Sequence, residues 1–335
     1  MTTRRRFIQH TLTGSLALAT LKRTSIFAAH GGETLTHAEA NAIRTNTAAP
    51  LLQAQQGETL ITILHTNDTH SQIDPLPAND ANAGKGGVAR RATLVSRVRK
   101  ANPNTLLVDA GDAWQGTPYF NLYKGEVEFR AMSAIGYDAM TLGNHEFDNG
   151  VEALADAIKK FVKFPIVSSN YDVRGTVLEP LVKPYITRDV GGIRIGIFGL
   201  GIQLEGLNAP ASFRGVKVLD PITTARETVK KLREQERCQM VVCASHLGYF
   251  PDSKTEIGDT QVASRVDGID FIASGHTHTF MDSLVLTRQP SGKTTVIFQV
   301  GKSGIYLGRV DFLFRNGALA AHAGNIIDLR SAELA

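Results

Sequence analysis

Five short apolar runs in this sequence each end in a cluster of polar residues, and this arrangement constrains the fold more than any other feature. The clusters occupy residues 67–70, 111–112, 143–146, 245–246 and 275–278. In layered α/β folds, ligands bind where loops leave the carboxyl ends of the strands, so clusters that are far apart in sequence can meet at one crevice. Any one of them alone is compatible with an ordinary turn, whereas all five together predict one functional site.

Strand-like and helical patterns alternate between residues 60 and 273, which predicts an α/β fold built in layers. The expected strands cover residues 60–64, 105–108, 139–142, 165–167, 193–200, 240–244 and 271–273. The expected helices cover residues 88–100, 126–135, 151–161 and 223–237. Further strands are expected at residues 283–287, 294–299, 305–314 and 318–322. These last strands follow one another without helices, so we expect an antiparallel meander that closes the sheet.

The amino terminus has the pattern of an export signal. Residues 3–9 resemble the twin-arginine motif, and a modestly apolar stretch at 11–21 and a basic pair at 22–23 follow it. This order predicts a signal peptide that is cleaved near Ala28 or Ala29, and therefore a periplasmic or otherwise extracytoplasmic protein. The alternative is a basic amino terminus without a targeting role.

Residues beyond the signal are small, polar and without hydrophobic period up to residue 58, as is typical of a linker. The expected layout is a signal peptide over residues 1–28, a polar linker over 29–58 and one folded domain over 59–335. The apolar stretch of the signal is too short to span a bilayer, which needs about twenty residues. We therefore expect no permanent membrane anchor.

The formal net charge of +4 is concentrated at the amino terminus. Five of the 36 basic residues lie within the first 28 positions, which contain no acidic residue. The remainder of the chain is nearly balanced in charge, so a nucleic-acid polymer is not an expected partner.

The polar clusters supply a mixed set of nitrogen and oxygen ligands without a thiolate. The candidate metal ligands are Asp68, His70, Asp112, Asn144, His246, His276 and His278. Such a set suits Zn, Mn, Fe, Co or Ni and does not suit an all-oxygen calcium site or a cysteine-rich zinc site. Seven ligands are too many for one open tetrahedral site, so we expect two divalent metal ions. Ions about 3.5–4 Å apart need a bridging carboxylate, which is Asp112 or Asp68.

The spacing of these residues resembles the calcineurin-like metallophosphoesterases over residues 60–314. The strings at 63–70 and 143–148 resemble the 5′-nucleotidase branch of that family. The resemblance implies a layered β-sandwich flanked by helices, folded as a single catalytic domain. It also implies hydrolysis of phosphate esters, because two metal ions can lower the pKa of a water molecule and neutralise charge on a phosphoryl group.

The same resemblance implies a role for each candidate ligand. Asp112 bridges the metals, Asp68, His70 and His278 complete one site, and Asn144, His246 and His276 complete the other. In some nucleotidases the position that matches His278 is a glutamine or asparagine, so the histidine here is expected to change the metal preference without removing the site.

His145 and Asp148 stand three residues apart, and the resemblance assigns them to a catalytic dyad. The carboxylate can orient the imidazole and favour its protonated form, so that His145 stabilises the leaving group or the phosphate. The alternative is that His145 only makes a hydrogen bond that supports the site. His65 lies inside an expected strand, where a structural role is expected, and Asn170 offers weak support to the site.

The expected substrate is a small phosphorylated molecule, above all a phosphomonoester such as a 5′-nucleotide. Phosphodiesters and nucleotide-sugar pyrophosphates are the enzymatic alternatives, and a metal-binding protein without catalysis is the alternative of another class. Full-length 5′-nucleotidases carry a further domain for recognition of the base, and this sequence ends at Ala335, about where that domain would begin. We therefore expect recognition by a partner chain or by loops near Trp114 and Tyr249–Phe250, although Trp114 alternatively packs beneath its loop.

Overall fold

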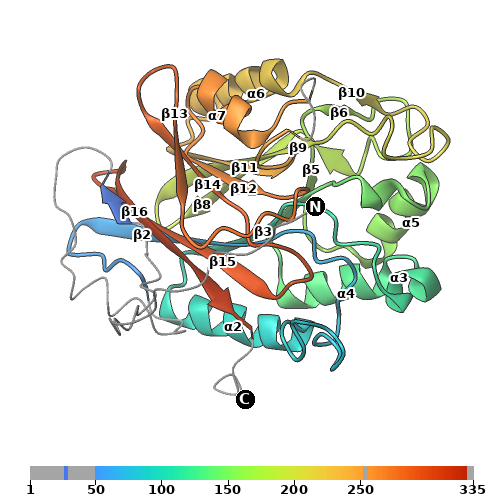
Figure 1. Cartoon of the computed structure of the whole chain (residues 1–335). Coiled ribbons are helices and arrows are strands. Elements are labelled where there is room, and N and C mark those ends of the chain that lie inside the picture. The colour runs from blue at the N-terminus through green and yellow to red at the C-terminus, as the bar shows by residue number, and fades with distance from the viewer. Residues whose placement is uncertain (1–25, 29–49, 252–255, 330–335) are drawn as a thin grey trace, which may run out of the picture.

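The computed structural model describes residues 26–28, 50–251 and 256–329, and two sheets run through this part of the chain (Figure 1). The larger sheet contains β1 (Ile26–Ala28), β2 (Glu58–Thr66), β3 (Thr105–Asp109), β4 (Ala139–Thr141), β5 (Ile166–Val167), β7 (Val182–Lys183), β15 (Tyr306–Arg315) and β16 (Ala318–Asp328). The smaller sheet contains β8 (Tyr185–Val190), β9 (Ile193–Gly201), β11 (Met240–His246), β12 (Phe271–Ser274), β13 (Val285–Arg288) and β14 (Thr294–Phe298). A separate antiparallel pair consists of β6 (Tyr171–Asp172) and β10 (Lys217–Val218).

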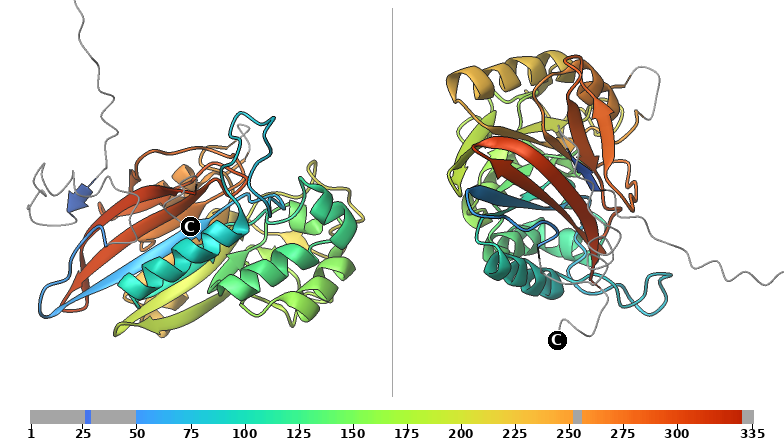
Figure 2. Two further views of the ribbon diagram at one scale, coloured as in Figure 1. Left: turned by 90° about the horizontal axis from the view of Figure 1, so that it is seen from below. Right: turned by 90° about the vertical axis from the view of Figure 1, so that its left-hand side faces the viewer.

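Helices cover the outer faces of both sheets, as the side views show (Figure 2). The described helices are α2 (Val88–Ala101), α3 (Pro118–Tyr123), α4 (Glu126–Ile135), α5 (Val151–Phe161), α6 (Pro221–Lys230) and α7 (Asp259–Arg265), with a 3₁₀ turn η1 (His145–Phe147) and a π turn η2 (Lys231–Gln235). The first four helices lie on the larger sheet, while α6 and α7 lie on the smaller sheet. The expected layered β-sandwich flanked by helices is confirmed.

Strand order explains how the polar clusters come together. The larger sheet has the order β1-β16-β15-β2-β3-β4-β5-β7, and the smaller sheet has the order β13-β14-β12-β11-β9-β8. Neighbouring strands β2, β3 and β4 are parallel, as are β9, β11, β12 and β14. Since parallel strands end on the same edge, each sheet brings its carboxyl-end loops to one side.

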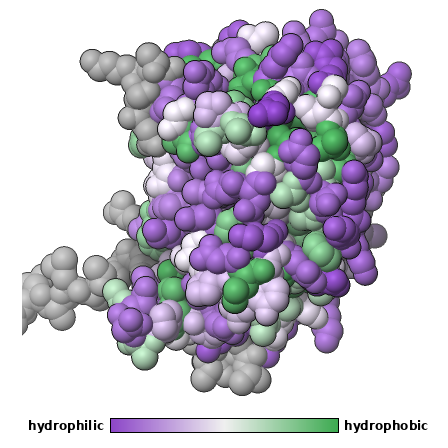
Figure 3. All heavy atoms as spheres, turned by 90° about the vertical axis from the view of Figure 1, so that its right-hand side faces the viewer, coloured by the Kyte–Doolittle hydropathy of each residue, from purple (hydrophilic) through white to green (hydrophobic). Residues whose placement is uncertain are grey.

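A core of apolar side chains lies between the sheets. Ile61 and Ile63 of β2 face Ile195 and Ile197 of β9 within one buried cluster, and each of these side chains has no exposed surface. On the side of the molecule that carries α3 and α5, exposed apolar residues form small patches between hydrophilic ones (Figure 3). The buried apolar surface is therefore concentrated between the layers, where its removal from water stabilises the fold.

The expected single meander after residue 279 is wrong. The first two of its strands, β13 and β14, join the smaller sheet, whereas β15 and β16 cross to the larger sheet and pair beside β2. Gly301 and Gly304 take left-handed backbone conformations, with φ of 75° and 57°, in the segment that makes this crossing. A period of two residues identifies strands, but it carries no information about which sheet they join.

The expected helix at 223–237 also differs from the structure. The helix α6 begins earlier, at Pro221, because Asp220 accepts a hydrogen bond from the backbone N–H of Thr223 and a proline suits the first helical position. Its regular part ends at Lys230, where the π turn η2 begins. The short helices α3 and α7 were not expected, since each has too few residues to show a helical period.

Part of the expected linker belongs to the fold. Leu51 and Leu52 are buried, and their backbone N–H groups donate to Oδ2 of Asp311 at 2.7 and 3.4 Å. Asp311 is itself buried, and its Oδ1 lies 3.0 Å from Nε of Arg309. This buried carboxylate anchors the chain ahead of residue 59, where the domain was expected to begin.

Most of the expected twin-arginine signal and of the linker lies outside the described residues. The exception within the signal is the backbone of residues 26–28, which pairs antiparallel with residues 321–323 of β16. In the described ranges, we find no helix whose length and apolar character would allow it to cross a membrane.

Candidate metal centre

Loops from both sheets meet at the candidate site and are joined by backbone hydrogen bonds. The N–H of Asp68, after β2, donates to the carbonyl of Gly111, after β3, at 3.0 Å, and the N–H of His70 donates to the carbonyl of Asp112 at 3.1 Å. From the smaller sheet, the N–H of His276 donates to both carboxylate oxygens of Asp68, at 3.0 and 3.1 Å. Residues that are more than 200 positions apart in the chain thus become neighbours.

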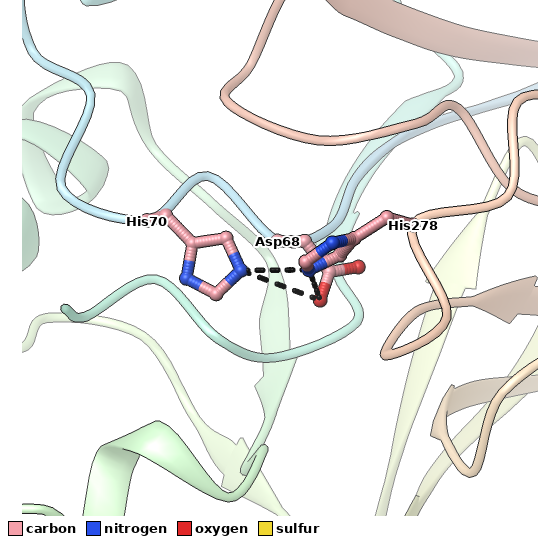
Figure 4. A group of neighbouring side chains, drawn as sticks. All are labelled: Asp68, His70 and His278. Carbon is pink, nitrogen blue, oxygen red and sulfur yellow. Dashed lines mark hydrogen bonds and ion pairs between the residues drawn. The ribbon is translucent and has the colours of Figure 1, made fainter. Parts of the chain in front are cut away.

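The side chains of Asp68, His70 and His278 form the first group (Figure 4), in which the ligand atoms all lie within 4.8 Å of one another. Nε2 of His70 and Nε2 of His278 are 2.9 Å apart, and Oδ1 of Asp68 is 3.9 and 3.5 Å from them. Two imidazole nitrogens and a carboxylate oxygen therefore converge on one point.

Asp112, His246 and His276 form a second group of the same kind. Oδ2 of Asp112 lies 3.0 Å from Nε2 of His246, and both residues are buried. Asp112 also belongs to a third group with His70 and His145, so its carboxylate faces both neighbouring sets of donors. Of the two carboxylates considered as a bridge, Asp112 has the more central position.

Asn144 lies beside the second group, because the backbone N–H of the next residue, His145, donates to Oδ1 of Asp112 at 2.9 Å. Within the described part of the chain, Oδ1 of Asn144 is buried without a hydrogen-bond partner. A buried polar atom without a partner is costly, and a cation at this place would satisfy it. The residues present therefore fit divalent metal ions.

Opposing electrostatic effects act on the residues at the centre. Burial raises the pKa of Asp112, but the imidazoles of His246, His145 and His70 outweigh it and hold that pKa well below its usual range. Burial lowers the pKa of His246, yet the carboxylates of Asp112 and Asp68 raise it to about 10. Asp112 is consequently ionised at neutral pH, which suits a cation ligand.

Backbone strain is concentrated in the same loops. The φ angles of Asp68, His70, Asp112, His276 and His278 are 48°, 48°, 55°, 72° and 51°. A residue with a Cβ atom in this left-handed region costs about 1–2 kcal/mol, and the conformation persists only where surrounding contacts hold it. Gly143 has a different constraint, since a Cβ there would lie 2.8 Å from Nε2 of His246.

His145 and Asp148 form the expected pair, with Nδ1 of His145 2.8 Å from Oδ2 of Asp148. Burial lowers the pKa of His145, but the hydrogen bond to Asp148 and the charge of Asp112 raise it above its ordinary value overall. The ring of His145 lies edge-on to that of His70, with 5.4 Å between centroids. Asp148 and Asp112 thus favour the protonated form of an imidazole that lies at the border of the first group.

Asn208, which the sequence did not indicate, supports this pair from the loop between β9 and β10. Its Nδ2 donates to the carbonyl of Asn144 at 3.0 Å and to Oδ1 of Asp148 at 3.2 Å. A lone asparagine in a polar loop carries no local signal for such a contact.

Glu146 belongs to the polar cluster at 143–146, but the sequence indicated no role for its side chain. Its buried carboxylate accepts hydrogen bonds from the backbone N–H groups of Gly143, Asp112, Ala113 and Trp114, at 2.7, 3.0, 2.9 and 3.3 Å. Glu146 therefore ties the loop after β4 to the loop after β3. The position of Glu146 in a polar cluster that follows an apolar run is the sequence signal for such a role.

Three residues considered from the sequence do not line the site. Trp114 is fully buried against Phe120 and Phe129, so it packs beneath its loop. His65 is buried in the core, as expected for a structural residue. Asn170 pairs with the backbone of Gly201, at 2.7 Å through both amide atoms.

The loop at Tyr249–Phe250 lies beside the 275–279 segment, because the N–H of Tyr249 donates to Oγ1 of Thr277 at 3.2 Å. The side chain of Phe250 is 57% exposed. This loop therefore remains a candidate for contact with a substrate.

Comparisons with known proteins agree with this geometry. A 5′-nucleotidase from Bos taurus is 36% identical over 296 residues, which cover 81% of this chain and 50% of the relative. The trifunctional nucleotide phosphoesterase protein YfkN from Bacillus subtilis is 32% identical over 285 residues, which cover 76% of this chain and 18% of the relative. The chain thus spans about half the length of the bovine relative and less of the bacterial one.

The fold is similar to the crystal structure of a 5′-nucleotidase precursor from Thermus thermophilus. The TM-score is 0.72 at 34% sequence identity, over 83% of this chain and 56% of that chain. Residues 61–280 match the calcineurin-like phosphoesterase family and include all of the candidate metal ligands. The chain belongs to the calcineurin-like phosphoesterases, a family of metal-dependent phosphoester hydrolases that includes the 5′-nucleotidases it is similar to.

Proposed function

We propose that this chain is an exported phosphoesterase with two divalent metal ions, and that it hydrolyses phosphomonoesters such as 5′-nucleotides. The observation that carries the proposal is the pair of donor groups, Asp68–His70–His278 and Asp112–His246–His276, at one meeting point of loops. Asp112 is the proposed bridge, because it faces donors on both sides. Asn144 completes the second site with its unpartnered Oδ1.

The bound ions would supply a nucleophilic water at neutral pH and would neutralise charge on the phosphoryl group. The protein residues hold the donors in place before the substrate arrives. His145, whose protonated form Asp148 favours, donates a hydrogen bond to the phosphate or to the leaving-group oxygen. Negative charge that develops on either oxygen is thereby stabilised by a fixed donor.

The nucleotide part of the proposal rests on the relatives, which are named as 5′-nucleotidases and a nucleotide phosphoesterase. One of these relatives is named as trifunctional, which supports a second class of ester substrate. Phosphodiesters and nucleotide-sugar pyrophosphates are the second candidates. Contacts to the rest of the substrate come from the loop at Tyr249–Phe250 or from a partner chain. Export is assigned to residues 1–28 on their sequence pattern alone.

Elemental analysis and a substrate panel test the proposal. Purified protein with added Mn²⁺ or Zn²⁺ is incubated with AMP, a UDP-sugar and a cyclic nucleotide, and the products are measured. We expect release of inorganic phosphate from AMP and two metal equivalents per chain. The Asp112→Asn variant, with an unchanged circular dichroism spectrum, should be inactive.

Turnover of the UDP-sugar or the cyclic nucleotide without turnover of AMP would replace the proposed substrate class by one of the second candidates. No turnover of any of the three would refute the catalytic role and leave a metal-binding protein.

A further inference from the structure

One short segment supplies a donor to each metal group. His276 and His278 lie two residues apart after β12, yet His276 belongs to the group of Asp112 and His246, while His278 belongs to the group of Asp68 and His70. Both have left-handed backbone conformations, with φ of 72° and 51°. The shape of this segment, residues 275–279, therefore decides how far apart the two donor groups stand.

The side chain of Gln299, just after β14, holds this segment on both sides of the histidines. Its Nε2 donates to the carbonyl of Gly275 at 2.6 Å and to Oγ of Ser274 at 2.7 Å. Its Oε1 accepts from Oγ1 of Thr277 at 3.2 Å and from the backbone N–H of Thr279. Gln299 is fully buried, and these contacts use both donors and both acceptor positions of its amide.

A second amide continues the connection to the first donor group. Nδ2 of Asn67 donates to Oδ2 of Asp68 and to the carbonyl of Gly301, at 2.6 Å each, and its Oδ1 accepts from the N–H of Val300 at 3.1 Å. Residues 299–301 thus lie between the Asp68 loop and the 275–279 segment and bond to both.

We infer that Gln299 is a positioning residue that fixes the separation of the two proposed metal ions, because it holds the segment that carries one ligand for each. The inference rests on the proposed dinuclear centre. Without the amide, buried polar groups of the segment lose their partners and the strained backbone at His276 and His278 is released. Paired metal binding then weakens, although all of the ligand side chains remain present.

Gln289, just after β13, offers a matched control, because its side chain contacts the residues that precede β12, whereas Gln299 contacts those that follow it. Its Nε2 donates to the carbonyl of Ile269 at 2.7 Å and to Oγ1 of Thr295 at 3.0 Å, and its Oε1 accepts from the N–H of Gly268 at 2.9 Å. It is 4% exposed. The Gln289→Met and Gln299→Met variants therefore remove comparable buried amides that bind the segments before and after β12.

The experiment titrates metal-free protein with Mn²⁺ by calorimetry and records the electron paramagnetic resonance spectrum of each loaded protein. We expect wild type and Gln289→Met to bind two equivalents and to give the signal of an exchange-coupled pair. In Gln299→Met, we expect one of the two equivalents to bind about 10–100-fold more weakly, as is usual when a supporting partner of a metal ligand is lost, and the coupled signal to be lost.

The Gln299→Glu variant keeps the shape and the acceptor oxygens but loses the donors, so it should show the same weakening and replaces Gln299→Met if that variant does not fold. Wild-type affinities and a coupled signal in either folded Gln299 variant would overturn the inference, and so would an equal loss in Gln289→Met. Fewer than two Mn²⁺ in wild type would overturn the inference and the dinuclear proposal together. Two Mn²⁺ without hydrolysis of any ester would overturn only the proposed function.

Discussion

The side-chain amide of Asn208 donates a hydrogen bond to Oδ1 of Asp148 at 3.2 Å, while Oδ2 of the same carboxylate lies 2.8 Å from Nδ1 of His145. The orientation of His145 is therefore set from two places, its own 3₁₀ turn and a loop some 60 residues later. A proposed catalytic imidazole gains a fixed direction from this arrangement, since both carboxylate oxygens are held.

Replacement of Asn208 by alanine should lower kcat about 10–100-fold, the usual effect of losing a residue that orients a functional side chain. KM should change little, because Asn208 supports the dyad and is not proposed to bind the substrate. Steady-state kinetics with AMP measure both constants. Ser212→Ala, in the same loop, removes only a hydrogen bond to Ala209 and serves as the control. Equal kcat values for Asn208→Ala and wild type would contradict the proposed support.

Glu146→Gln should destabilise the protein by about 1–3 kcal/mol, the cost of leaving a buried donor unsatisfied. Each carboxylate oxygen of Glu146 accepts two backbone N–H groups, so an amide NH₂ group faces two donors in either orientation. Burial and the charge of Asp112 raise the pKa of Glu146 to about 8, so urea unfolding of the metal-free protein at about pH 9, where the carboxylate is ionised, measures the change. The exposed Glu152→Gln on α5 is the control and should leave the free energy of unfolding nearly unchanged. A Glu146→Gln variant as stable as that control would show that the carboxylate is not needed to join the two loops.

The sequence predicted which residues follow the strands better than it predicted the hydrogen bonds that position those residues. Asp112 and His246 could be found because each follows an apolar run, and the carboxyl ends of parallel strands meet. The role of Gln299 could not be found from the sequence, since any polar residue can end an apolar run. Its four hydrogen bonds arise only when β14 joins the smaller sheet. The sheet that a strand joins is decided by packing between distant segments, which a local pattern does not record.

Asp259 should give the protein a specific dependence of stability on pH. Burial raises the pKa of this carboxyl to about 7, although Oγ of Ser245 donates to it at 2.5 Å. The folded chain thus keeps a proton that the unfolded chain, with a pKa near 3.8, has lost, so stability falls as pH rises from about 4 to about 7 and then levels off.

The Asp259→Asn variant should lack this contribution, which amounts to about 1.4 kcal/mol per pKa unit of difference between the two states. Urea unfolding of wild type and variant from about pH 4.5 to about pH 8 covers the range in which stability should fall. It gives the difference between the two slopes of unfolding free energy against pH. Asp282→Asn, an exposed position, should follow the wild-type curve. Parallel curves for wild type and Asp259→Asn would show that the carboxyl titrates alike in both states.

Metal binding should release protons. Burial lowers the pKa of His246, but Asp112 and Asp68 raise it to about 10, so Nε2 holds a proton in the metal-free protein. A metal ligand must lose that proton, and for one proton released the apparent affinity falls about tenfold for each unit by which the pH is lowered. Calorimetric Mn²⁺ titrations in buffers of different ionisation enthalpy count the protons directly. His246→Gln should release fewer of them, and an affinity independent of pH would contradict the assignment of His246 as a ligand.

The pair of imidazoles at His70 and His278 should favour zinc over manganese in the first site. Their Nε2 atoms are 2.9 Å apart beside Oδ1 of Asp68, which is a donor set rich in nitrogen (Figure 4). Nitrogen ligands suit Zn²⁺, whereas amide and carboxylate oxygens suit Mn²⁺. In His278→Asn an amide oxygen replaces one nitrogen, so the ratio of the Zn²⁺ and Mn²⁺ affinities should fall by about tenfold, the scale on which one altered ligand contact acts. Competition of the two metals for the metal-free protein gives this ratio. His322→Gln, a buried histidine outside the donor groups, should keep the wild-type ratio, and an unchanged ratio in His278→Asn would show that His278 does not bind the metal.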